Sequence, residues 1–169
     1  SRLPDHLTLI RIPVLTAGIR PFSGHDRHCH TRRMLDPLVA ATATELADRL
    51  RRREISSVDV VEAHLDRIDE VDGAVNAIPV RRAREAILAD AAQLDALSQP
   101  AGPLHGLPVA VTDLEDVAGL PTSSGSTVTS TRPARASGLV ASRLQAAGAV
   151  IIGKTNTPEF GTGSHTFNP

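Results

Sequence analysis

The chain of 169 residues is long enough to bury a sizeable core, and its 41% hydrophobic and 22% charged residues are ordinary for a globular protein. Its formal net charge of −1 gives no electrostatic basis for nucleic-acid or anionic-membrane partners, and no apolar stretch reaches the length of a membrane span. Cys29 is the only cysteine, which excludes an internal disulfide, fits a reducing compartment and predicts a cytoplasmic protein.

Residues 1–33 differ from the rest of the chain. They hold six arginines against two aspartates and show no sustained period of helix or strand. We therefore predict a poorly ordered extension, followed by a folded part over residues 34–169. Zinc-type ligands occur in the extension, but their spacing matches no closed zinc site, so no metal is expected there. These ligands are His25, His28, Cys29 and His30.

Apolar residues at three- and four-residue steps predict three helices in the first half of the folded part. Their expected bounds are Thr44, as N-cap, to about Arg53; Ser56 or Ser57, as N-cap, to Gly73; and about Arg81 to Leu97. Their expected buried residues are Leu46, Leu50 and Ile55; Val58, Val61, Leu65 and Ile68; and Ala83, Ile87, Leu94 and Leu97.

The pattern then changes to buried strands. Leu107–Thr112 is a short apolar run with β-branched residues, typical of a strand covered on both faces. A long loop over residues 113–135 leads to a helix that is capped by Ser137 and ends at Gly148, and residues 149–152 form a second buried strand. The inward residues of that helix are predicted to be Leu139, Val140, Leu144 and Ala147. Strand, helix and strand in this order predict an α/β fold with a right-handed crossover and a parallel pair.

Three motifs, in their order and spacing and with Gly125-Ser126 between the first two, carry a family resemblance. They are Gly102-Pro103-Leu104-His105-Gly106-Leu107-Pro108-Val109-Ala110-Val111; Ala146-Ala147-Gly148-Ala149-Val150-Ile151-Ile152-Gly153-Lys154-Thr155-Asn156; and Pro158-Glu159-Phe160. Together they resemble the amidase signature family, whose members hydrolyse amides with a Ser-Ser-Lys triad. The resemblance covers about residues 42–169. It implies an incomplete amidase signature fold, with a helical arm and the first strands of a mixed sheet, and no metal or organic cofactor.

The resemblance places Thr112 where the family has its catalytic lysine, a buried general base. A threonine hydroxyl is not basic near neutral pH, and the resemblance places the family's two serines in a segment beyond Pro169. We therefore expect a truncated chain that is inactive alone. Thr112 could reflect a natural loss, an engineered change or a sequencing difference. Alternatively, it is a strand-end threonine whose hydroxyl caps a backbone group.

Three functions remain open at this point. The parent activity implied by the resemblance is hydrolysis of a carbon–nitrogen amide bond through a serine acyl-enzyme, with a small-molecule amide substrate if the full-length chain is active. The chain could instead be a non-catalytic remnant or pseudoenzyme that acts as a binding or assembly partner. It could also be a fragment of the amidase subunit of a tRNA-dependent amidotransferase. Apolar strands without their later neighbours predict self-association in each case.

Other chemistry-bearing residues are predicted to be structural. Ser123, Ser124 and Ser126 belong to a turn that satisfies its own backbone. Asp113, Glu115 and Asp116 lack the spacing of a calcium loop and predict a solvated acidic turn. Lys154 is the only lysine, but a strand separates it from Gly148, which argues against a phosphate loop. The resemblance does not place it in the triad. His105 is predicted to be a hydrogen-bonded packing residue.

Overall fold

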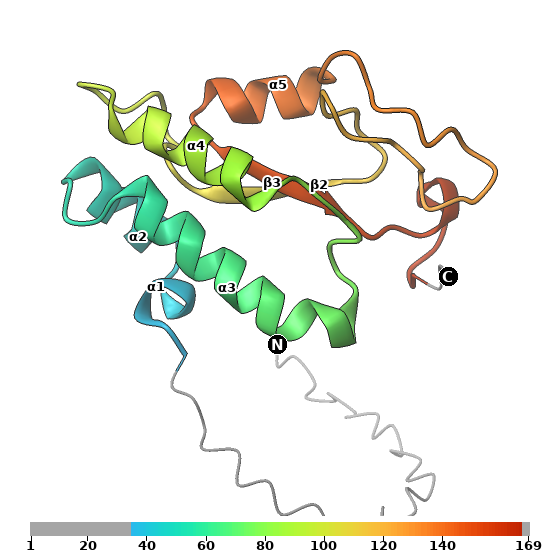
Figure 1. The fold of residues 1–169 in the computed structure, drawn as a ribbon, viewed down its shortest axis with the longest axis horizontal. Helices are drawn as coiled ribbons and strands as arrows, with labels where there is room; N and C mark the ends of the chain where they lie inside the picture. Colours follow the sequence, from blue (N-terminus) through green and yellow to red (C-terminus); the bar gives the residue numbers. More distant parts are fainter. Residues whose placement is uncertain (1–34, 167–169) are drawn as a thin grey trace, which may run out of the picture. The chain divides into compact units, whose positions relative to one another are not determined.

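The computed structural model describes residues 35–166, so the predictions for residues 1–33 and for the zinc-type ligands within them lie outside the described residues. In the described part, three helices come first, and the strands of a small sheet then alternate with further helices (Figure 1). The elements are α1 (Pro37–Ala40), α2 (Ala43–Arg51), α3 (Ser57–Val75), β1 (Val80–Arg81), α4 (Arg84–Asp95), β2 (Pro108–Thr112), α5 (Leu139–Ala146), β3 (Val150–Thr155) and the 3₁₀ helix η1 (Glu159–Gly161).

The strands of the described part form one mixed sheet in the order β1-β3-β2. β3 lies in the centre, parallel to β2 and antiparallel to β1. The predicted parallel pair is therefore confirmed. Its register places Val111 beside Lys154 and Thr112 beside Thr155. Both carboxyl ends thus lie at the same edge of the sheet.

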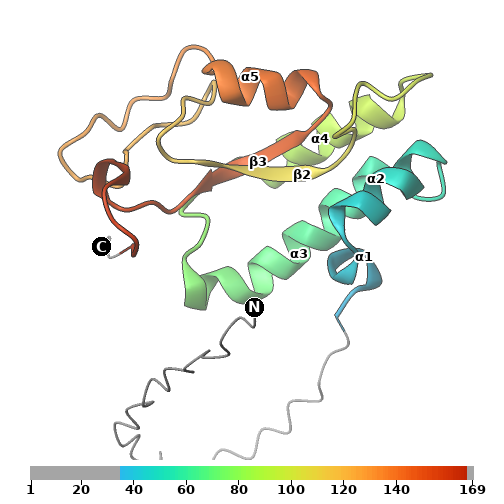
Figure 2. The ribbon, with the colours of Figure 1, turned by 180° about the vertical axis from the view of Figure 1, so that it is seen from behind.

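Helices cover both faces of this sheet. α3 and α4 lie on one face, and α5 lies on the other (Figures 1 and 2). Successive side chains of a strand point to opposite faces, and β3 follows this rule. Val150 and Ile152 pack in the core under α3 and α4, whereas Ile151 packs with Ala141 of α5. This alternation explains why β3 is apolar at successive positions.

The predicted helices are present, but their ends differ from the prediction. Thr42, not Thr44, is the N-cap of α2, because its hydroxyl accepts from the backbone N–H of Glu45 in a capping box. Ser56 caps α3 in the same way. α3 continues through Gly73 and ends where Asn76 adopts a left-handed conformation. α4 spans twelve residues, shorter than predicted.

Three further predictions, two on α5 and one on β2, are corrected by the structure. Ser137 does not cap α5; its hydroxyl accepts from the N–H of Ala118, and Gly138 is the N-cap. Leu139 and Val140 are 65% and 46% exposed, because the short helix turns mainly Ala141 and Leu144 toward the sheet. β2 is also only half-buried, since it lies at the edge of the described sheet.

One helix in the described residues, α3, is long, but neither it nor any other helix of residues 35–166 combines the length and apolar character needed to cross a membrane.

Candidate functional site

The position singled out by the sequence, Thr112, lies at the carboxyl end of β2. Its side chain is exposed, and its hydroxyl makes no hydrogen bond with any residue in the described range. The alternative that this hydroxyl caps a backbone group is therefore not what the structure shows. Thr112 contributes a neutral hydroxyl to this edge of the sheet, with neither a base nor an acid beside it in hydrogen-bond contact.

Lys154 lies one residue earlier on the neighbouring strand, and its side chain is fully buried. Its Nζ atom lies 2.7 Å from Oδ1 of Asp113 and donates to Oγ1 of Thr122 at 2.7 Å and to the carbonyl of Pro121 at 3.0 Å. Each of the three N–H groups of an ammonium thus has an acceptor within reach. Lys154 therefore ties β3 to the loop after β2.

Asp113 is the anionic half of this cluster, and its side chain is 4% exposed. Oδ1 faces the Lys154 ammonium and receives no other donor within the described residues, whereas Oδ2 accepts from both the N–H and the hydroxyl of Ser123. Burial works against the charged form, but the hydrogen bonds from Lys154 and Ser123 outweigh it, so the pKa of Asp113 lies below its ordinary value of 3.8.

Asp113 corrects the prediction of a solvated acidic turn. Its carboxylate is buried and paired, and only Glu115 and Asp116 of the three lie nearer the surface. Asp116 accepts a hydrogen bond from Thr122 at 2.7 Å, which extends the cluster outward. Within residues 35–166, no group of three His, Cys, Asp or Glu side chains is placed to hold a metal ion.

The serines of the loop after β2 are held in structural hydrogen bonds. Ser123 donates to Asp113 and accepts from the N–H of Gly125. Ser126 donates to Oε1 of Glu159 at 2.6 Å, which links the loop to η1. Ser124 has a positive φ of 53°, and its carbonyl accepts from the N–H of Phe160. The loop bonds to its own backbone, as predicted, and also to Asp113 and Glu159.

His105 lies at the other end of β2, in the turn that precedes the strand. Its Nδ1 accepts from the N–H of Ala101 at 3.1 Å, so it is a hydrogen-bonded residue as predicted. Burial lowers the pKa of His105 below its ordinary value of 6.5; the nearby Arg53 acts in the same direction and Asp95 opposes it.

Sequence reasoning did not identify the Lys154–Asp113 pair. A signal for it was present: the only lysine and an aspartate stand at the ends of the two strands predicted to be parallel neighbours. The register was needed to bring them together, because a shift of one residue turns a side chain to the opposite face of the sheet.

The geometry defines an α/β domain whose polar cluster lies at the carboxyl ends of parallel strands, the edge at which open α/β folds bind ligands. The family model for amidases matches residues 59–169. The chain belongs to the amidase signature family, and its mixed sheet with helical arm is part of that fold.

Relatives of two kinds are similar to this chain. A glutamyl-tRNA(Gln) amidotransferase subunit of Nocardia farcinica is 44% identical over 137 residues, which cover 79% of this chain and 28% of that protein. An acylamidase of Rhodococcus erythropolis is 38% identical over 135 residues, covering 76% of this chain and 28% of the acylamidase.

A solved structure is similar as well. The native peptide amidase of Stenotrophomonas maltophilia has a TM-score of 0.66 and 29% identity, over 73% of this chain and 26% of its own. The chain thus spans about a quarter of the length of the proteins it matches.

Proposed function

We propose that residues 34–169 form the N-terminal part of an amide-hydrolysing domain and that residues 1–33 are an extension to it. Membership of the amidase family supports this proposal, as does the similarity to an acylamidase and a peptide amidase. In such a domain the chain contributes the helical arm, the first strands of the sheet and the edge at which Thr112 stands. The reaction of the parent domain is hydrolysis of a carbon–nitrogen amide bond in a small molecule through a serine acyl-enzyme.

The 169-residue chain by itself is proposed to be inactive. The observation that carries this proposal is that Thr112 is neutral while the only lysine, Lys154, is buried and committed to acceptors. A general base must be within hydrogen-bond reach of the proton it removes, and an ammonium with three occupied donors has no lone pair to accept one. Neither Thr112 nor Lys154 can therefore act as the base that activates a serine at this edge.

Serine-directed labelling tests this proposal on the chain as it exists. A fluorophosphonate probe, read by intact mass, is expected to leave the chain unmodified, and hydrolysis of simple primary amides is expected to stay at background. Trypsin treated in parallel is the positive control for the probe. Stoichiometric labelling of Ser123, Ser124 or Ser126 would overturn the proposal, because it would show an activated nucleophile in the loop.

A second candidate function is that of an assembly partner, either as a non-catalytic remnant or as part of a tRNA-dependent amidotransferase. Similarity to glutamyl-tRNA(Gln) amidotransferase subunits favours it. Exposed apolar side chains on α5 and in the loops support it too, and β2 presents its outer edge without a neighbour in the described sheet. Such an edge promotes association with another chain. The exposed side chains are Leu114, Val128, Leu139, Val140 and Phe160.

Self-association of the isolated chain distinguishes this candidate from a closed monomer. Light scattering over a concentration series is expected to show a mass that rises with concentration, and the rise is expected to persist after removal of residues 1–33. A compact monomer at every concentration, with one sharp cooperative melt, would contradict it.

A further inference from the structure

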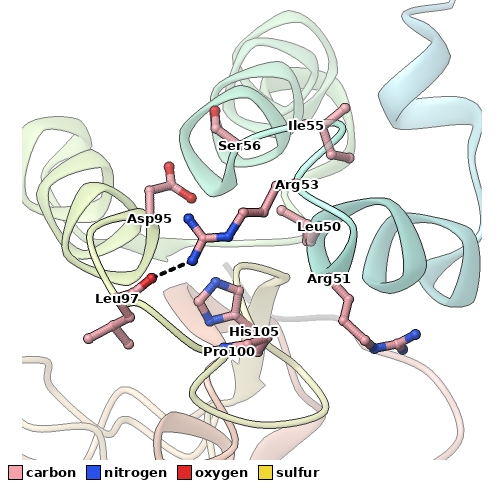
Figure 3. Close-up of a pocket in the computed structure, with 9 residues that line it drawn as sticks. All are labelled: Leu50, Arg51, Arg53, Ile55, Ser56, Asp95, Leu97, Pro100 and His105. Carbon is pink, nitrogen blue, oxygen red and sulfur yellow. Dashed lines mark hydrogen bonds between the residues drawn. The ribbon is translucent and has the colours of Figure 1, made fainter.

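A pocket of about 170 Å³ lies at the amino end of β2, opposite to Thr112 (Figure 3). The C-terminus of α2, the N-terminus of α3, the C-terminus of α4 and the turn before β2 surround it. Its volume corresponds to roughly six water molecules of the liquid, which is enough for a small organic molecule. Its lining includes the polar residues Arg51, Arg53, Ser56, Asp95 and His105, and Leu50 and Ile55 are part of its apolar wall.

Arg53 occupies a position that favours glycine. It follows the last turn of α2 with a φ of +58°, the left-handed conformation that side chains rarely adopt. α5 ends with the same pair of backbone hydrogen bonds, and there the equivalent residue is Gly148. At Arg53 the side chain leads into the pocket, where Nη2 donates to the carbonyls of Leu97 and Ser98 at 2.8 and 2.9 Å. Its Nη1 and Nε have no acceptor within residues 35–166.

One other side chain adds a donor to the same space. A backbone N–H can only donate, so the bond from Ala101 makes Nδ1 of His105 the acceptor and leaves the proton of the neutral ring on Nε2. Among the described residues, nothing accepts from that Nε2–H. Ser56 differs: its oxygen accepts from the N–H of Asp59, and its hydroxyl also serves the carboxylate of Asp59, whose pKa this side-chain hydrogen bond helps to lower.

The acceptors of the pocket are already engaged. The carboxylate of Asp95 accepts from the N–H of Ser57 at 2.7 Å and from that of Val58 at 3.1 Å, at the N-terminus of α3. The positive end of that helix offsets its charge. The carbonyl of Leu97 accepts from Arg53. Because the pocket has unused donors and its acceptors are already bonded, it suits a ligand that only accepts hydrogen bonds.

We propose that this pocket binds a short aliphatic carboxylate. The carboxylate accepts from the guanidinium of Arg53 and from the imidazole of His105. Guanidinium groups match the two oxygens of a carboxylate in geometry and charge. The alkyl chain lies against Leu50 and Ile55. This site is separate from the sheet edge at Thr112 and does not depend on the proposed function.

Titration of the 169-residue chain with sodium butyrate, at ionic strength held constant with sodium chloride, tests the proposal. The ring resonances of His105 and the Hε resonance of Arg53 are expected to shift and to saturate at millimolar butyrate, the affinity range of ligands with few heavy atoms. Butyramide, which has the same shape without the charge, is expected to bind about tenfold more weakly.

Two variants test whether Arg53 and His105 form the site, and each is chosen to disturb the local structure as little as possible. Arg53→Gly fits the left-handed backbone and deletes the guanidinium, and His105→Asn keeps an acceptor for Ala101 while it deletes Nε2–H. Each is expected to raise the dissociation constant about tenfold. Arg51→Gln is the matched charge control, since Arg51 lines the pocket but its guanidinium pairs with Asp48, and it is expected to change affinity less than about twofold.

Three results would overturn the proposal. The first is a shift that grows linearly with butyrate and does not saturate. The second is unchanged affinity in both Arg53→Gly and His105→Asn, each shown to be folded by its amide spectrum. The third is an equal loss in Arg51→Gln and Arg53→Gly, which would mean that only net charge matters.

Discussion

The polar side chains at the two ends of β2 differ in how many of their hydrogen-bonding groups are already bonded. At the carboxyl end, Lys154 and Asp113 are removed from water and use nearly all their hydrogen-bonding capacity on each other and on the loop after β2. At the amino end, Arg53 and His105 keep donors unused. The end at which the family resemblance places Thr112 therefore holds charged groups with a structural role, whereas the opposite end, for which no catalytic or binding role was predicted, has unused hydrogen-bond donors.

Removal of the buried cation is the most severe test of this contrast. Lys154→Met is expected to lower the free energy of unfolding by about 3–5 kcal/mol, because it leaves the Asp113 carboxylate buried without its partner. Urea unfolding followed by circular dichroism measures the change. The double variant Lys154→Met/Asp113→Leu is expected to recover most of the loss, since no unpaired charge remains.

An exposed ion pair provides the matched control for that experiment. Arg67 and Glu70 are 40% and 45% exposed and pair at 2.9 Å on α3. Arg67→Met is expected to cost less than about 1 kcal/mol. Equal losses in Lys154→Met and Arg67→Met would show that the buried cluster is not a special feature of this fold.

The next largest effect on stability is expected at Gly148, where the end of α5 contacts the turn before β2. Gly148 has a φ of +90°, and a Cβ there would lie 2.8 Å from the backbone Cα of His105. Gly148→Ala is expected to cost about 1–3 kcal/mol of unfolding free energy, through backbone strain and this contact. Gly73→Ala is the control: the space around it is open within α3, so it is expected to stabilise by about 0.5–1 kcal/mol.

Lowering the pH is expected to reduce the free energy of unfolding in two separate ranges, one set by Asp113 and one by His105. The folded-state pKa of Asp113 is depressed, so its stabilisation is present above its unfolded value of 3.8 and is lost as pH falls through the lower folded value. His105 also has a depressed pKa, so unfolding free energy begins to fall below about pH 6.5, where the unfolded state takes up a proton first. Denaturant midpoints measured from pH 8 to pH 3 should show both steps.

His105→Asn is expected to abolish the upper step and leave the lower one. Persistence of the upper step in this variant would assign it to another group and would contradict the role given to His105.

Arg53→Gly is expected to have the smallest effect on stability. The variant loses two hydrogen bonds to the carbonyls of Leu97 and Ser98 but relieves the left-handed backbone at residue 53, so the two changes nearly cancel to within about 1 kcal/mol. The same urea unfolding measures it. A loss as large as that of Lys154→Met would mean that the pocket end is as structural as the carboxyl end.

Apolar periodicity predicted much of the fold. The buried run that became β3 and the helical pattern of α3 were recognisable because many residues contribute to each signal. β1 was not predicted as a strand of the sheet, since it has two residues and depends on pairing with a strand about seventy residues later. The start of α2 was predicted two residues too late, because two candidate N-caps lie close together. Thr42 and Thr44 are both good N-caps, and only Thr42 lies three residues before a glutamate.

The candidate site was predictable only in part. Position 112 was found through a motif, and the structure places it at the carboxyl edge of the sheet. The partner of Lys154 depends on strand register. The pocket around Arg53 depends on contact between the turn that joins α2 to α3 and the chain just after α4, where Leu97 lies 44 residues after Arg53. Such long-range placement leaves no local pattern, which explains why Arg53 and Asp95 went unnoticed in the sequence.

The central claim, that this segment lacks a catalytic base at residue 112, is tested most directly in a chimera. The segment of the Rhodococcus erythropolis acylamidase that aligns with this chain would be replaced by this chain's residues, and hydrolysis of the acylamidase's substrate measured with Thr112 and with Thr112→Lys, after matching melting temperatures. The Thr112 chimera is expected to hydrolyse the substrate at the background rate. The Thr112→Lys chimera is expected to be about 10² to 10⁴-fold faster, which is the usual contribution of a positioned base. Parental activity in the Thr112 chimera, or no gain from lysine in a chimera that melts like the parent, would contradict the claim.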